Sequence, residues 1–281
     1  MEHQSSFLRK FFLFFLVAIM FVGCSNNGKN PSPIIELSKD YSLVFQDEFD
    51  GEVLDTTVWG FHNIGKRRDA VNVKEACLIN ENGELEIRNW TKFKGNDTIH
   101  HAGMIETKVN FTFGYYEARI KFNIEMGSWG AFWIMYHNTR GPFTSEDNPM
   151  KDGVEIDIVE FVPTNSRYAS QNLHWNGYGE FHQQLGTDQL LNGELEGYHV
   201  YSLLWTPEKY VFYIDGEPTW TVQEAISHMP EFVILSTEIE DKSWGGNNSI
   251  PKEGYGTFED TKNIMYVDYV RVFQKNSEII R

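Results

Sequence analysis

The stretch GVEIDIVEF, residues 153–161, places three carboxylates in a segment that otherwise has the composition of a buried β-strand. Residues two apart in a strand face the same side, so Glu155 and Asp157 share one face. Strict alternation would turn Glu160 towards the core, where a bare carboxylate is costly. One extra residue around Ile158–Val159, a β-bulge, returns Glu160 to the face of the other two acids. The spacing therefore predicts a bulged strand with all three acids on one open face.

Three acids on one open face indicate general acid–base chemistry. Retaining glycoside hydrolysis uses two carboxyl groups about 5–5.5 Å apart, and inverting hydrolysis uses a pair about 6.5–9.5 Å apart. An aspartate between two glutamates would help to separate their pKa values, leaving one ionised and one protonated. Two other interpretations remain open at this point: a solvated strand face, and oxygen ligands for a hard cation such as calcium.

Short runs rich in β-branched and aromatic residues surround this stretch, separated by turns such as ENGE and IDGEP. They predict strands within 83–90, 104–111, 115–124, 131–137, 198–206, 209–216, 231–239 and 264–273. So many short strands favour an all-β sandwich of two antiparallel sheets or a jelly roll. The only helix that the pattern suggests is TVQEAISHM, residues 221–229. Two long irregular segments, 137–152 and 240–262, are candidate cleft walls.

Composition limits the class of partner. The 281 residues carry a formal net charge of −16, which disfavours a nucleic-acid partner. Aromatic residues make up 15% of the chain, and the 8 Trp and 13 Tyr fit a carbohydrate binder, because sugar rings stack on aromatic faces. The alternative is that these features serve only solubility and core packing. We expect a monomer that acts on a polysaccharide or oligosaccharide.

The N-terminus resembles a secretory signal. Arg9 and Lys10 precede the apolar run FFLFFLVAIMFVG, which ends at Cys24. This run of about 13 residues is too short to span a membrane, which takes about 20. The sequence FVGC is similar to a bacterial lipobox, in which the cysteine after the cleavage site is acylated. The alternative is an ordinary signal peptide with an incidental cysteine.

These features predict three parts: a lipoprotein-type signal peptide over 1–23, the lipidated Cys24 with a flexible tether over 24–40, and one domain over 41–281. The protein would be exported and held to a membrane by its lipid, at the cell surface or in the periplasm of a bacterium. Cys77 is the only other cysteine, so no intramolecular disulfide is expected. We interpret Cys77 as a small buried hydrophobic residue.

From about residue 43 to 274, successive motifs resemble glycoside hydrolase family 16. They are LVFQDEFDGEVLDTTVW (43–59), NENGELEIRN (80–89), GMIETKVNFTFGYYEARIKF (103–122), GSWGAFWIMY (127–136), EIDIVE (155–160), LLWTPEKYVFYIDGE (203–217) and YVDYVRVF (266–273). The EIDIVE spacing is similar to the bulged E-x-D-x-x-E form, which laminarinases share with galactan-cleaving relatives. The resemblance implies a concanavalin A-like β-jelly roll whose concave sheet forms the substrate cleft.

Roles for individual residues follow from this resemblance. Glu155 would be the nucleophile of a retaining reaction, Asp157 its electrostatic helper and Glu160 the general acid/base, with no cofactor for catalysis. A structural calcium would be held by the Asp268 side chain and the Gly83 carbonyl. The alternative for Asp268 is a plain surface aspartate.

The resemblance also implies residues that line the cleft. Trp129 and Trp133 share a strand face and would stack on sugars, with core packing as the alternative for Trp133. His174 would lie near the acid/base, although a lone histidine is more often structural. The remaining candidates for substrate contact are Trp175, Ser236 and Glu238.

The most favoured activity is endo-hydrolysis of β-1,3-glucan or mixed-linkage β-glucan. The alternative within the enzyme class is an endo-β-galactosidase acting on algal galactan or a mucin-type O-glycan. Gly130, where proline is usual, and LSTEIEDKSWGGNN (235–248) depart from the glucanase pattern. Alternatives of other classes are a carbohydrate-binding lipoprotein without turnover and a cation-dependent structural protein.

Overall fold

The computed structural model describes residues 37, 39–95, 97–137, 147–163, 168–190, 197–242 and 248–277. These residues belong to one compact unit, Pro33–Arg281. The predicted signal peptide (1–23), Cys24 and most of the predicted tether lie outside the described residues. Within the described part of the chain, no helix combines the length and apolar character needed to cross a membrane.

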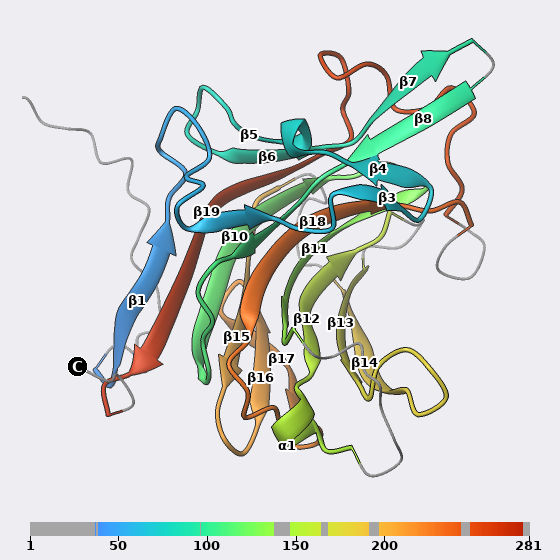
Figure 1. The fold of residues 1–281 in the computed structure, drawn as a ribbon. Helices are drawn as coiled ribbons and strands as arrows, with labels where there is room; N and C mark the ends of the chain where they lie inside the picture. Colours follow the sequence, from blue (N-terminus) through green and yellow to red (C-terminus); the bar gives the residue numbers. More distant parts are fainter. Residues whose placement is uncertain are drawn as a thin grey trace, which may run out of the picture. The chain divides into compact units, whose positions relative to one another are not determined.

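Two antiparallel sheets pack face to face (Figure 1). In spatial order the first contains β17 (Glu217–Val222), β16 (Tyr210–Ile214), β15 (His199–Trp205), β10 (Gly114–Asn123), β19 (Ile264–Lys275), β6 (Leu85–Arg88) and β5 (Cys77–Ile79), and β1 (Tyr41–Asp47) also pairs with β19. The second contains β14 (Gln183–Leu190), β13 (Tyr168–Trp175), β12 (Glu155–Phe161), β11 (Ser128–Met135), β18 (Phe232–Ile239), β9 (Met104–Thr107) and β2 (Trp59–Phe61). This arrangement confirms the predicted all-β jelly-roll sandwich of two antiparallel sheets.

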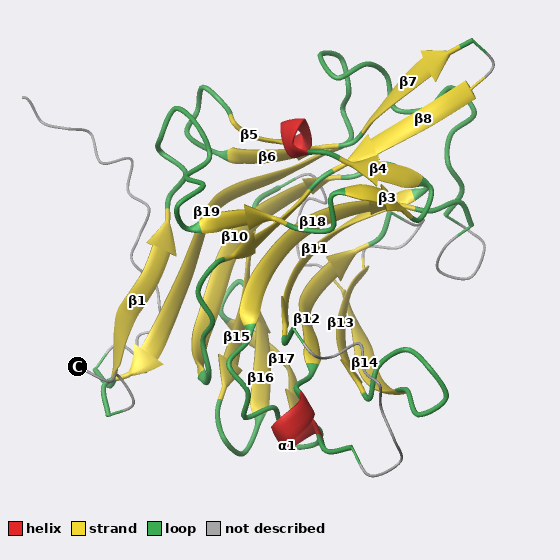
Figure 2. Cartoon of the chain, viewed as in Figure 1, coloured by secondary structure: helices red, strands yellow, loops and turns green. Residues whose placement is uncertain are grey.

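A third, smaller sheet lies beside the second one in Figure 1 and carries part of the cleft wall described below. Its spatial order is β3 (Gly65–Arg67), β4 (Ala70–Asn72), β8 (Asp97–Ala102) and β7 (Trp90–Lys94), and β4 and β8 run parallel. Strands dominate Figure 2, where the described helices are one 3₁₀ turn (Lys74–Ala76) and the short α1 (Pro149–Asp152).

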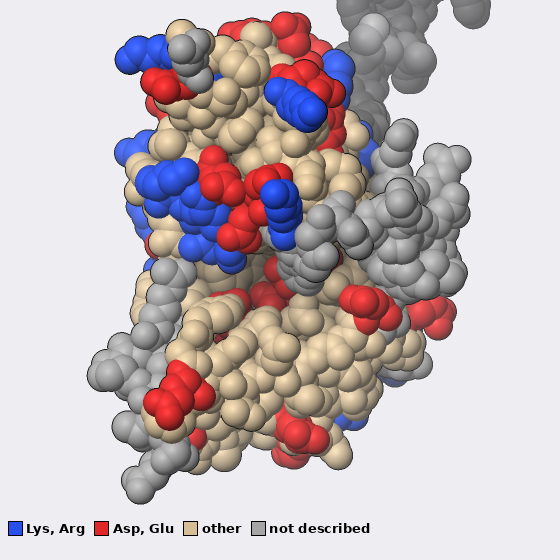
Figure 3. All heavy atoms as spheres, turned by 90° about the vertical axis from the view of Figure 1, so that its right-hand side faces the viewer, with Lys and Arg blue, Asp and Glu red and all other residues tan. Residues whose placement is uncertain are grey.

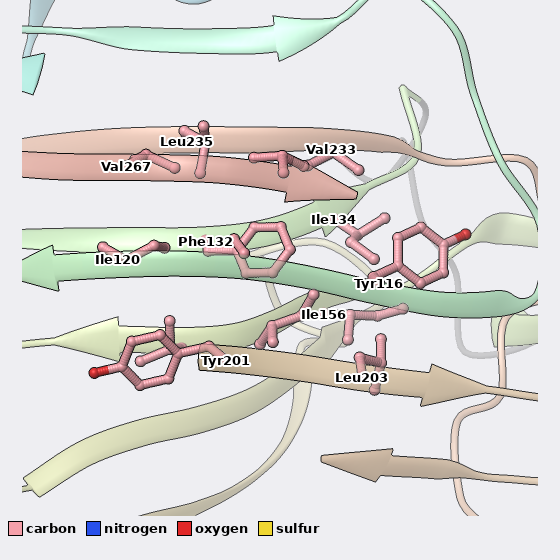
Figure 4. Close-up of a cluster of buried hydrophobic side chains, with 14 of the residues drawn as sticks. Tyr116, Ile120, Phe132, Ile134, Ile156, Tyr201, Leu203, Val233, Leu235 and Val267 are labelled. Carbon is pink, nitrogen blue, oxygen red and sulfur yellow. The ribbon is translucent and has the colours of Figure 1, made fainter. Parts of the chain in front are cut away.

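The core lies between the two large sheets and follows the alternation of their strands (Figure 4). Tyr116 and Leu203 point inward from the first sheet, and Phe132 and Ile156 point inward from the second. Each is fully buried, and each lies on the core-facing side of its strand. Cys77 is also buried, as predicted.

The strands predicted from the sequence are all present, but the predicted helix over 221–229 is wrong. Thr221 and Val222 end β17, and the chain then turns. Ala225 has a left-handed φ of 53°, which a helix interior does not allow. Ser227 instead uses its backbone N–H to bind the Tyr210 hydroxyl at 2.7 Å. The apolar residues of this segment make separate core contacts rather than one helical stripe.

Glu231 is a carboxylic acid inside the sandwich, with no exposed surface. Its Oε1 accepts hydrogen bonds from the Val154 N–H at 3.1 Å and from the Ser227 hydroxyl at 2.5 Å. Its Oε2 has no hydrogen-bond partner among the described residues. Burial raises the pKa of Glu231 to about 8, so the folded protein holds a proton there at neutral pH.

This buried acid predicts a pH-dependent stability. The pKa of Glu231 is higher in the folded protein than in the unfolded chain. Below about pH 4.5 the carboxyl is protonated in both states, and its contribution to the free energy of unfolding is complete. As pH rises towards 8 this contribution is lost, because only the unfolded chain ionises. Glu231→Gln, which is always neutral, removes this loss. We expect the variant to gain on the order of a few kcal/mol relative to the wild type between pH 5 and pH 8.5 in urea unfolding. An equal difference between the two proteins at both pH values would contradict a proton on Glu231.

Candidate active site

The acidic strand β12 contains the predicted bulge. On the β11 side, Phe132 lies opposite Val159 while Trp133 lies opposite Asp157, so Ile158 is the extra residue. On the β13 side the register also shifts between Asp157 and Glu160. Ile158 and Val159 are both fully buried in the core. The bulge therefore lets two successive apolar residues enter the core and returns Glu160 to the face of the other acids.

The three acids line a cleft of about 830 Å³ on the outer face of the second sheet. Figure 3 shows this face hollowed, with acidic side chains in the hollow and Lys and Arg side chains along its upper edge. The lining residues come from β3, β11, β12, β13, β14 and β18 and from three turns or loops, those after β3, β13 and β18. They are Arg67, Arg68, Trp129, Ala131, Trp133, Glu155, Asp157, Glu160, His174, Tyr178, Gly179, Gln184, Ser236, Glu238 and Glu240.

The acids in this cleft differ from ordinary surface carboxylates. Asp157 is only 4% exposed, and burial together with the charges of Glu160 and Glu155 holds its pKa well above the usual range. Burial also raises the pKa of Glu160 to about 8, although the Asn172 side chain opposes this by donating a hydrogen bond to Glu160 Oε2 at 2.8 Å. At neutral pH the site therefore holds a proton where a general acid would need one.

His174 lines the cleft, but at the opposite end of the acid row from Glu160. In the strand register it faces Glu155, and its Nε2 lies 3.5 Å from Asp157 Oδ2. Burial lowers the pKa of His174 to about 4, so this imidazole is neutral at pH 7. The prediction that His174 lies near Glu160 is therefore wrong, and Asn172 takes that place because it is two residues earlier on the same face of β13.

Trp175 does not belong to the cleft. It packs against the hydrophobic core, because side chains alternate along β13 and its neighbour His174 faces outward. The prediction of a substrate contact at Trp175 is wrong for this reason.

Trp129 and Trp133 do line the cleft, as predicted, but as part of its floor. They are 4% and 5% exposed. The Arg68 guanidinium lies 4.9 Å from the centre of the Trp129 ring, and Trp133 donates its indole N–H to Ser236 Oγ at 3.0 Å. Gly130 between them faces the core, where a Cβ would meet the Phe122 ring at 2.8 Å. The glycine at this position is therefore a packing feature and not a cleft feature.

Glu238 is held by two arginines that the sequence interpretation missed. Arg67 donates to both carboxylate oxygens at 2.7 and 2.9 Å, and Arg68 donates to Oε2 at 2.6 Å. Arg68 also reaches Glu240 Oε2 at 3.1 Å. Glu238 is 6% exposed, so this is a largely buried charge network at the cleft wall. The only local indication in the sequence was the basic run KRR at 66–68.

Tyr178 is another cleft residue that the sequence interpretation missed. It lies in the loop after β13, and its hydroxyl donates a hydrogen bond to Glu155 Oε1. The WNGYG sequence of this loop marks a turn but does not reveal where the aromatic ring ends.

One of the two residues predicted to hold calcium, Asp268, has a cationic partner within the protein. Asp268 accepts a hydrogen bond from Arg119 Nη1 at 2.9 Å, so a guanidinium already neutralises the one acidic side chain of the predicted pair. Among the described residues, Glu155, Asp157 and His174 are the group whose ligand atoms lie close enough together for a metal, within 4.8 Å of one another. Tyr178 already binds this group through Glu155.

Comparison with known proteins places these features in a family. Residues 42–275 match the family model described as "Beta-porphyranase A-D, GH16 domain". The chain is 30% identical over 260 residues to β-porphyranase E of Zobellia galactanivorans, covering 82% of this chain and 85% of that protein. It is 25% identical over 291 residues to a β-glucanase of Rhodothermus marinus, covering 92% and 93%.

A solved structure shows the same fold. The laminarinase from Rhodothermus marinus superposes with a TM-score of 0.68 at 21% sequence identity, covering 84% of this chain and 98% of that one.

The charge network predicts unequal effects of two neighbouring substitutions. Glu238→Gln leaves two guanidinium groups beside a largely buried neutral amide, and we expect it to lower the free energy of unfolding by about 2–4 kcal/mol. Glu240→Gln breaks only the half-exposed pair with Arg68 and should cost less than about 1 kcal/mol. Urea unfolding of both variants provides the comparison. Equal losses would mean that the Glu238 pairs are as weak as a surface ion pair.

Proposed function

The chain belongs to glycoside hydrolase family 16, and we propose that Glu155, Asp157 and Glu160 carry out its reaction in the roles of nucleophile, helper and acid/base. It is an endo-acting glycoside hydrolase of β-linked polysaccharides, and hydrolysis with retention is typical of this family. The observation that carries the assignment of roles is the bulge in β12, which brings all three acids to the floor of one cleft.

In the first step, Glu155 attacks the anomeric carbon while Glu160 donates its proton to the leaving oxygen. The raised pKa of Glu160 supports this role, because an acid that is protonated at neutral pH can give a proton to a poor leaving group. In the second step, ionised Glu160 takes a proton from the water that releases the sugar from Glu155. Asp157 lies between them and influences the ionisation of both. The chemistry needs no cofactor.

For the substrate we propose a β-galactan of the porphyran type. The family model is named for β-porphyranases and covers nearly the whole predicted domain, and the 30% identity to β-porphyranase E supports the same choice. Residues 235–248 depart from the glucanase pattern, and Glu238 in this segment is bound by Arg67 and Arg68 at the cleft wall. This difference in the cleft wall further supports a substrate other than a glucan. A β-1,3-glucan or mixed-linkage glucan is the second candidate, favoured by the β-glucanase similarity along the whole chain. A mucin-type O-glycan is a third.

We further propose that the enzyme is an exported monomer, anchored to a membrane through lipid on Cys24, with 24–40 as the tether and 41–281 as the catalytic domain. The motif FVGC and the apolar run before it support this proposal. We expect Cys24→Ser to move the protein from the membrane fraction to the soluble fraction of a bacterial host. Labelling with a fatty-acid probe that stays equal in the wild type and the variant would rule out lipid at this cysteine.

The activity is tested with the soluble domain, residues 25–281, on separate samples of porphyran, agarose, laminarin, mixed-linkage glucan and mucin O-glycans. We expect a ladder of oligosaccharides from porphyran, resolved by chromatography. Glu155→Gln serves as the matched control, because the isosteric amide keeps the fold and removes the charged nucleophile. We expect its rate to fall by at least about 1,000-fold, since covalent catalysis is lost.

A ladder from laminarin alone would replace the galactan with the glucan assignment. Comparable turnover by Glu155→Gln would refute the nucleophile role, whichever polymer is cleaved. For Glu160→Gln, we expect a larger loss on the polysaccharide than on an activated aryl glycoside, because only the former needs a proton on its leaving group.

A further inference from the structure

Tyr178 reaches the carboxylate of Glu155 from outside the sheet. After β13, Asn176 and Gly177 both take left-handed φ values, 61° and 67°, which turn the chain back over the cleft. Such a turn suits Asn and Gly, which tolerate this conformation. The Tyr178 hydroxyl then donates a hydrogen bond to Glu155 Oε1. The loop thus brings a neutral donor to the acid that the proposed mechanism uses as nucleophile.

A stack of rings holds the tyrosine in this place. The Tyr178 ring lies 5.0 Å from the His182 ring and 5.7 Å from the His174 ring. The two imidazoles stack at 5.2 Å, and His174 Nδ1 is 3.0 Å from His182 Nε2. His174 in turn lies beside Asp157. The ring stack therefore fixes the hydroxyl relative to two of the three acids, although Tyr178 itself is 60% exposed.

We propose that Tyr178 is a positioning residue for Glu155: its hydroxyl orients the carboxylate and stabilises the ionised form. This inference rests on the proposed function, in which Glu155 is the nucleophile. A hydrogen bond from a neutral donor to a charged carboxylate is among the stronger ones in proteins. Although much of the ring is exposed, desolvation of the hydroxyl in the cleft and the nearby charge of Glu155 raise the pKa of Tyr178, so the hydroxyl stays a donor throughout the working pH range.

Several ionisable groups besides Tyr178 face Glu155 or act on it. They are Asp157 and Glu160 on β12, His174 on β13, His182 after the turn, and Glu231 below the sheet. Removing only the Tyr178 hydroxyl leaves all of them in place. A change in the ionisation of Glu155 in such a variant therefore reports the lost hydrogen bond.

The test is Tyr178→Phe, which keeps the ring and its stack. The matched control is Tyr198→Phe, because Tyr198 also donates its hydroxyl to a glutamate, Glu84, which is not among the cleft residues. For Tyr178→Phe we expect kcat to fall about 10- to 100-fold with KM changed less than about threefold. The acidic limb of the pH–rate profile should move up by about one unit, because the ionised carboxylate loses a donor. Tyr198→Phe should match the wild type in both.

A second measurement does not depend on activity. The carboxyl carbons of ¹³C-labelled glutamate are titrated by NMR, and the Glu155 signal is identified by its loss in Glu155→Gln. We expect the Glu155 midpoint to be higher in Tyr178→Phe than in the wild type. An unchanged midpoint, or unchanged kcat and acidic limb in an active enzyme, would overturn the proposal. If the wild type cleaves none of the polymers while the midpoint still moves, the proposed function fails and the contact between Tyr178 and Glu155 stands.

Discussion

A single extra residue in β12 decides what the second sheet can do. Ile158 has no counterpart on β11, and this shift lets Ile158 and Val159 both enter the core while Glu160 stays in the cleft. Without the bulge, strict alternation would bury Glu160 among apolar side chains and would also turn Phe161 towards the cleft, and both are unfavourable. The burial of Ile158 and Val159 and the alignment of the acid row are thus two consequences of one local distortion.

Burial disfavours the ionised form of a carboxyl group and raises its pKa, and two acids of the second sheet are affected in this way. Burial in the cleft floor raises the pKa values of Asp157 and Glu160, and the neighbouring carboxylates raise them further. A proton is then available at neutral pH without any metal or cofactor. Asn172 and His174, on the neighbouring strand, supply neutral polar groups beside these acids. Neutral partners orient the carboxyls and leave them protonated, whereas an arginine in either position would favour their ionised form.

The strands and the bulge were predictable because they depend on local alternation, and the same rule would have excluded Trp175, which must face away from His174. Alternation also places Gly130 on the core side. What the sequence could not reveal depends on contacts between distant segments. Arg67 meets Glu238 across 171 positions, and no local pattern links them. Tyr178 depends on two left-handed residues that redirect a loop. The helix predicted over 221–229 failed because Val222, Ile226 and Ser227 have separate tertiary partners.

Some residues of the cleft belong to the second sheet and others belong to neighbouring segments, and this division affects how the substrate specificity of the cleft can change. The acids and the tryptophans belong to the second sheet, whose register is fixed by its core-facing side chains, so they tolerate little change. Arg67 and Arg68 belong to the small third sheet and its turn, and Tyr178 belongs to the β13–β14 loop. These segments touch the cleft without contributing to the register of the acid strand. A change of substrate can therefore proceed through them while the geometry of Glu155 and Glu160 is preserved, which is consistent with the similarity of this chain to both a β-glucanase and a β-porphyranase.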